Sequence, residues 1–91
     1  MQAISLTLIG RDGCHLCDDA WSVITDSTAD FVNLEISHRK VEEDPAWMSA
    51  YTDSVPVVLI NNQWHSQWHV DASALREALV SAGAKLAQEG K

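Results

Sequence analysis

Basic side chains are scarce in this sequence, and it has no long apolar run. Six lysine and arginine residues stand against thirteen aspartate and glutamate residues, so the formal net charge is −7 at pH 7. That charge repels phosphate backbones and anionic lipid, so neither nucleic acid nor a membrane surface is an expected partner. No segment approaches the roughly 18 apolar residues that a membrane span requires. The amino-terminal residues also lack the basic start and apolar centre of a secretory signal, so we expect a cytoplasmic protein.

Cysteine is scarce as well, and the two cysteines that are present, Cys14 and Cys17, form one Cys-x-x-Cys motif. A disulfide between them would close almost no loop, so it would contribute little to stability. In a reducing compartment such a pair is more typical of catalysis or metal binding than of structural cross-linking.

The length and the apolar content predict one small domain. A chain of 91 residues can bury one modest core but not two. Apolar residues make up 46% of the sequence, which is characteristic of a folded chain and not of a disordered one. We expect the domain to span residues 1–83 and a tail to follow at 84–91.

The pattern of apolar residues and helix caps predicts the order β-α-β-α-β-β-α. The expected strands are residues 4–9, 31–36 (with an extension through Val41), 57–60 and 63–68, and the expected helices begin near Cys14, at Asp44-Pro45 and at Asp71. A helix joins the first two strands, which should therefore be parallel. Asn61-Asn62 is a hairpin signal that makes the last two strands antiparallel. The prediction is an α/β fold with a mixed four-stranded sheet and helices on both faces.

Several apolar side chains are expected to build the core. The four tryptophans are predicted to lie mainly in the interior, with Trp21 shielding Cys17 and with Trp64 and Trp68 on one face of the last strand. Three further groups are expected to share a face each: Val32, Leu34 and Ile36; Trp47, Met48 and Tyr51; and Ala72, Leu75, Leu79 and Ala82.

The Cys-x-x-Cys motif is expected at the junction of a loop and the first helix. Cys14 would lie at the helix N-terminus, where unpaired backbone N–H groups and the helix dipole favour a thiolate. A thiolate is both the attacking nucleophile and the better leaving group in disulfide exchange. Cys17 would lie one turn further on, more buried, as the resolving thiol. Arg11, His15 and Asp18 flank the pair and are interpreted as residues that modulate it.

Three segments resemble the glutaredoxin-like branch of the thioredoxin superfamily. They are strand 4–9 running into Gly-Arg-Asp-Gly-Cys-His-Leu-Cys-Asp-Asp-Ala, then Asp44-Pro45 with its helix, then Ser54-Val55-Pro56-Val57-Val58. The resemblance implies a thioredoxin-like fold and a thiol–disulfide oxidoreductase that works in the reducing direction. It also implies a cis peptide bond before Pro56, which would face the dithiol, and a substrate segment held at Val55 and Pro56.

The resemblance also defines the expected cofactors and partners. Relatives that bind glutathione carry a Gly-Gly pair followed by acidic residues after the last strand, whereas residues 61–70 here contain no glycine. We therefore expect no tightly bound cofactor and weak or absent glutathione binding. The expected partners are a protein or small molecule that contains a disulfide, and a thiol or reductase that donates electrons.

Two other interpretations remain open at this stage. The fold could serve as a non-catalytic binding or adaptor module with an idle or regulatory dithiol. Alternatively the motif could bind metal, because Cys14, Cys17, His65 and His69 copy the ligand spacings of a zinc site. Against zinc, His65 and His69 would lie about 13 Å apart on one strand. A cluster shared between subunits is the other metal-binding arrangement.

Overall fold

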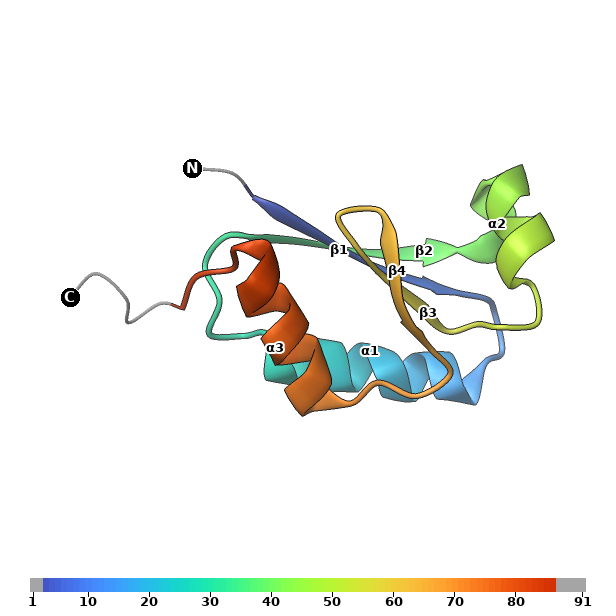
Figure 1. The fold of residues 1–91 in the computed structure, drawn as a ribbon. Coiled ribbons are helices and arrows are strands. Elements are labelled where there is room, and N and C mark those ends of the chain that lie inside the picture. The colour runs from blue at the N-terminus through green and yellow to red at the C-terminus, as the bar shows by residue number, and fades with distance from the viewer. Residues whose placement is uncertain (1–2, 87–91) are drawn as a thin grey trace.

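A computed structural model describes residues 3–86 of the chain (Figure 1). Its elements are β1 (Ile4–Gly10), α1 (His15–Ser27), β2 (Leu34–Lys40), the short 3-10 helix η1 (Val41–Glu43), α2 (Pro45–Tyr51), β3 (Val57–Ile60), β4 (Gln63–Gln67) and α3 (Ala72–Ala82). The predicted order of strands and α-helices is confirmed, and η1 is an addition between β2 and α2.

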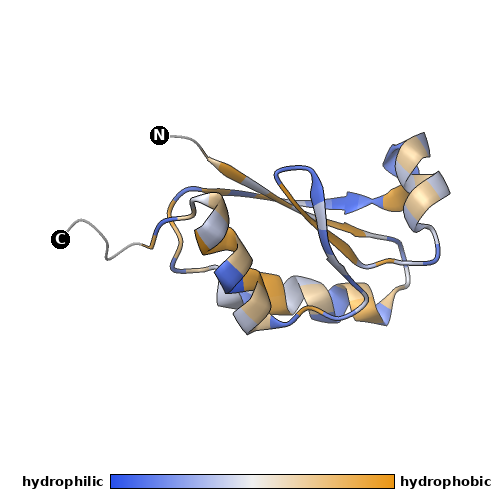
Figure 2. Ribbon diagram, in the orientation of Figure 1, coloured by the Kyte–Doolittle hydropathy of each residue, from blue (hydrophilic) through white to orange (hydrophobic). Residues whose placement is uncertain are grey.

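The four strands form one mixed sheet in the order β2-β1-β3-β4. β1 runs parallel to β2, with α1 as the crossover, and antiparallel to β3. β3 and β4 form an antiparallel hairpin. Figure 2 shows the two central strands as mainly apolar ribbons, whereas the edge strands β2 and β4 are largely hydrophilic. The sheet therefore places the end of β1, which leads to the cysteines, beside the start of β3.

Helices lie on both faces of the sheet. α1 and α3 lie together on one face (Figure 1) and enclose the larger core. Leu75 and Leu79 of α3 are fully buried there, and burying each leucine contributes about 1.5–3 kcal/mol. On the other face, Trp47 and Tyr51 of α2 pack against a second cluster of buried side chains, which is formed by Ile9, Cys17, Val41, Val55, Val57 and Leu59.

The helix caps explain where the second and third helices begin. The Asp44 carboxylate accepts a hydrogen bond from the Ala46 N–H at 2.8 Å, and Pro45 occupies the first turn. Asp71 caps α3 in the same way, and Gly83 ends that helix with a left-handed φ of 111°. These local signals were predicted from the sequence and are confirmed.

The predicted start of the second strand at residue 31 is wrong, because β2 begins at Leu34. The chain first turns back after α1, and the Phe31 N–H donates to the Thr28 carbonyl at 3.1 Å. Phe31 then forms an isolated bridge with Leu86, inside the segment expected to be a tail. Val32 is 63% exposed, so it does not share a buried face with Leu34.

The prediction that Trp64 and Trp68 lie in the core is also wrong, because they are 54% and 49% exposed. A bulge pairs Val58 with Ser66 but Leu59 with Trp64, so one extra residue breaks the alternation along β4. Trp68 lies beyond the end of the strand, with a φ of 69°. The two indoles therefore do not share one buried strand face.

Two predicted helix faces are each wrong in one residue, for reasons of helix geometry. Met48 is 43% exposed, because only Trp47 and Tyr51, one turn apart on the short α2, contact the second cluster. Ala72 is exposed in the first turn of α3, and the buried stripe of that helix begins at Leu75.

Candidate active site around the Cys14–Cys17 disulfide

The loop between β1 and α1 brings the first cysteine to the start of a helix. Gly13 has a φ of 73°, a left-handed conformation that glycine adopts without strain. Cys14 is then the N-cap of α1, and its Sγ accepts a hydrogen bond from the Cys17 N–H at 3.1 Å. The sulfur thus takes the place that a capping oxygen has at other helices. Cys14 therefore lies at the N-terminus of α1, as the sequence predicted.

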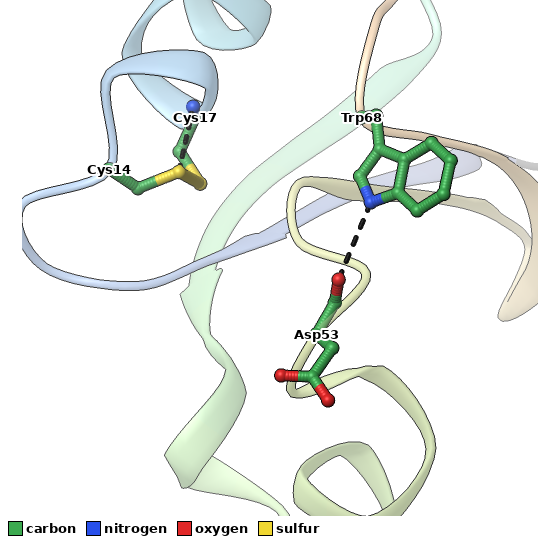
Figure 3. The surroundings of a disulfide bond; sticks show 4 residues. All are labelled: Cys14, Cys17, Asp53 and Trp68. Carbon is green, nitrogen blue, oxygen red and sulfur yellow. Dashed lines mark hydrogen bonds between the residues drawn. A yellow bond between two sulfur atoms is a disulfide. The ribbon is translucent and has the colours of Figure 1, made fainter.

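Cys14 and Cys17 form a disulfide across the first turn of α1, with a Cα–Cα distance of 5.2 Å (Figure 3). The two residues differ in exposure. Cys17 is 2% exposed and belongs to the second core cluster, whereas Cys14 is half-buried at its edge. A reactant from solvent therefore meets Cys14 first.

Gly10, the last residue of β1, lies directly against Cys17. A Cβ placed on Gly10 would come within 3.0 Å of the Cys17 Sγ and 3.1 Å of its Cβ. These distances are shorter than ordinary van der Waals contacts, so a Cβ at this position would require Cys17 or the end of β1 to shift by a few tenths of an ångström. Gly10 directly follows the expected strand 4–9, and a glycine between an apolar strand and a Cys-x-x-Cys motif is the sequence signal for this contact.

A pocket of about 200 Å³ opens beside the buried cysteine. Its lining residues are Arg11, Asp12, Gly13, Cys17, Asp18, His38 and Lys40. Arg11 and Asp18, both predicted to modulate the dithiol, are thus brought to it, and His15 lies exposed on the first turn of α1. The Lys40 ammonium pairs with the Asp12 carboxylate at 3.1 Å, and this hydrogen-bonded partner raises the pKa of Lys40.

His38 is a pocket residue that sequence reasoning missed. It comes from β2, far from the motif in sequence, and its imidazole stacks on the Trp21 indole with centroids 4.7 Å apart. Trp21 also packs against the core between the sheet and α1. Only the parallel pairing of β1 with β2 brings His38 here, opposite Leu8, so no local pattern could have found it.

The peptide bond between Val55 and Pro56 is cis, as the resemblance implied. Both residues are buried, and Val55 belongs to the same cluster as Cys17. The Pro56 carbonyl accepts a hydrogen bond from the Trp68 N–H at 2.7 Å. The Trp68 indole N–H donates to the Asp53 carbonyl at 3.4 Å (Figure 3). Sequence analysis had assigned Trp68 to the core, so its place at this loop was missed.

The four residues of the zinc alternative do not form a site. Within residues 3–86, no three side chains of histidine, cysteine, aspartate or glutamate lie close enough to hold a metal ion. His65 is the residue that the bulge inserts into β4, and His69 follows the end of that strand.

Among residues 3–86, none of the helices has the length and apolar character that a membrane span requires.

Comparison with known proteins agrees with this geometry. Residues 5–80 match the Glutaredoxin-like domain family (DUF836). The chain belongs to this glutaredoxin-like family. An uncharacterized protein of Mycobacterium tuberculosis is 25% identical over 80 residues, covering 84% of this chain and 82% of that protein.

Solved structures support the family and show the fold. A structural-genomics target from X. campestris is 34% identical, with a TM-score of 0.66 over 84% of this chain and 96% of that one. A thioredoxin from Halobacterium salinarum is 21% identical, with a TM-score of 0.63 over 88% of this chain and 74% of that one. This glutaredoxin-like protein therefore has a thioredoxin-like fold, and its cysteine pair fits a redox role.

Proposed function

We propose that this glutaredoxin-like protein is a thiol–disulfide oxidoreductase that reduces disulfides through Cys14 and Cys17. The observation that carries the proposal is the unequal exposure of two cysteines in one disulfide at a helix N-terminus. Cys14 meets solvent and the backbone donors of the first turn, whereas Cys17 is buried behind it. This difference supports an attacking role for Cys14 and a resolving role for Cys17.

The proposed reaction has two exchange steps. In the reduced protein, the Cys14 thiolate attacks one sulfur of a substrate disulfide, forms a mixed disulfide and releases the first substrate thiolate. Cys17 then loses its proton and attacks the Cys14 sulfur. The Cys14–Cys17 disulfide forms, the second substrate thiolate leaves, and two electrons have passed to the substrate. A thiol or a reductase then reduces the Cys14–Cys17 disulfide again.

The neighbouring residues have supporting roles in this proposal. Val55 and Pro56 hold an extended substrate segment beside the dithiol. Arg11, His15 and Asp18 set the charge around the reacting sulfur. The substrate is a disulfide-containing protein or small molecule in the cytoplasm. The protein uses no tightly bound cofactor and binds glutathione weakly or not at all, because residues 61–70 contain no Gly-Gly pair.

Reduction of insulin disulfides tests this function against the adaptor alternative. With dithiothreitol as donor, catalytic amounts of the protein should precipitate the insulin B chain well before dithiothreitol alone does. Protein alkylated at both cysteines is the matched control, because it keeps the chain but has no free thiol. Equal precipitation times with untreated protein, alkylated protein and no protein would leave only a non-catalytic role.

A further inference from the structure

Trp68 presents a large apolar surface beside the proposed active site. It is 49% exposed, although tryptophan is on average a well-buried residue type. Its backbone N–H is bonded to the Pro56 carbonyl, so the residue is attached to the loop that carries the cis proline. Figure 3 shows the indole and the disulfide in one view, with Asp53 below the indole.

The conformation of Trp68 is strained and fixed at the same time. Its φ of 69° lies in the left-handed region, which bulky side chains seldom adopt. The indole hydrogen bond to the Asp53 carbonyl holds the ring over the loop. Such strain persists where the surroundings enforce it, and it is concentrated at binding and catalytic sites. Solvent exposure, strain and fixation together indicate a surface that contacts a ligand.

The surroundings of the indole indicate the chemistry of that ligand. Trp68 shares a small recess of about 90 Å³ with the beginning of α1, lined by Leu16, Asp19, Ala20, Val23, Trp68, His69 and Val70. Leu16 lies between the two cysteines and is 40% exposed. The indole therefore shares a recess with the residue that stands between the two cysteines in the sequence. Asp19 lines the recess, and the exposed Asp53 accepts the indole hydrogen bond through its backbone carbonyl. The net charge of the chain is −7.

We infer that Trp68 determines which substrate the protein prefers. The preferred substrate is an extended, positively charged polypeptide, and the Trp68 indole contacts an apolar side chain next to that polypeptide's reacting cysteine. The inference rests on the proposed disulfide-reductase function and narrows its substrate class. An apolar side chain would cover the indole and Leu16, while basic neighbours would face Asp19 and the net negative charge of the chain. A small disulfide would reach Cys14 without touching Trp68.

Matched peptide disulfides test the inference. One peptide carries leucine beside its cysteine and arginines further along, the second replaces leucine by serine, and the third replaces the arginines by glutamates. The unmodified protein should show kcat/KM values about tenfold or more higher for the first peptide than for the second. It should also prefer arginine to glutamate, and added salt should weaken that preference.

Variants then assign the preference to the indole. Trp68→Ala should reduce the leucine-over-serine ratio to near one, whereas Trp68→Phe should keep much of it. Trp64→Ala is the matched control, because Trp64 is equally exposed but lines a different pocket with α3. The rate of bis(2-hydroxyethyl) disulfide reduction is measured for every variant, and each peptide rate is divided by it. Trp68→Gly should lose the preference yet unfold at a higher temperature than Trp68→Ala, because glycine adopts this φ without strain.

Each outcome separates this inference from the proposed function. An unchanged leucine preference in Trp68→Ala, or an equal loss in Trp64→Ala, would overturn the role of Trp68 while leaving the reductase function intact. Fast reduction of the small disulfide with no discrimination among the peptides would do the same. Failure of the unmodified protein to reduce either the small disulfide or any peptide would overturn both proposals.

Discussion

Replacing Cys14 by serine should lower disulfide-reductase activity to the uncatalysed rate, whereas Cys17→Ser should leave a protein that forms one mixed disulfide and does not turn over. Cys14 is half-buried at the helix N-terminus, and Cys17 is 2% exposed behind it. Without the resolving thiol, the mixed disulfide on Cys14 has no internal route to release. Intact-protein mass spectrometry after incubation with a peptide disulfide should show a stable adduct of one peptide thiol on Cys17→Ser and none on Cys14→Ser.

Alkylation supplies an independent assignment of the two sulfurs. When the reduced protein meets a limiting amount of iodoacetamide, peptide mapping should find the label on Cys14 first. The Cys14→Ser,Cys17→Ser double variant controls for reaction at other side chains. Adducts on Cys14→Ser, or preferential labelling of Cys17, would reverse the two roles.

Replacing Gly10 by alanine should lower the free energy of unfolding by about 1–3 kcal/mol, the usual range for overpacking a buried position. The new methyl group would lie 3.0 Å from the Cys17 Sγ, so either the end of β1 or the first turn of α1 must move. Urea unfolding of the oxidised proteins measures the loss. Because the displaced turn carries both cysteines, disulfide-reductase activity should fall with stability.

A double-mutant cycle separates the sulfur contact from a general cost of filling a strand position. The cycle is run in a Cys14→Ala background, so that no disulfide forms in any member. In that background, Gly10→Ala should lower the free energy of unfolding by less when Cys17 is also alanine. The coupling energy between the two substitutions should be about 0.5–3 kcal/mol, the range for residues in contact. An equal cost with and without the Cys17 sulfur would contradict a contribution of the Sγ contact and would leave only the Cys17 Cβ at 3.1 Å.

The reactive motif and the helix boundaries could be predicted because their causes are local. The Asp44 and Asp71 caps and the left-handed Gly83 each act within a few residues of their own helix. The same is true of Cys14, whose place at the start of α1 follows from the glycine-containing loop before it. Such features depend on neighbouring backbone groups, which a single sequence displays directly.

The residues that complete the site could not be predicted, because they are brought there by pairing between distant strands. His38 reaches the pocket only through the parallel register of β1 and β2. The place of Trp68 depends on the bulge in β4 and on a hydrogen bond to Pro56, and simple alternation along a strand predicted the opposite exposure. The closeness of Gly10 to Cys17 likewise depends on how α1 packs on the sheet.

An equilibrium redox titration of the Cys14–Cys17 pair tests the central claim most directly. The helix N-terminus stabilises the Cys14 thiolate, and the nearby carboxylates of Asp18 and Asp19 oppose it. A thiolate that is only modestly stabilised favours the disulfide, so we expect a reversible two-electron couple nearer about −270 mV than about −120 mV. Asp18→Asn and Asp19→Asn should raise that potential, because each removes a repulsion that destabilises the reduced form. A reduction potential near about −120 mV, or a potential that neither substitution changes, would contradict the account.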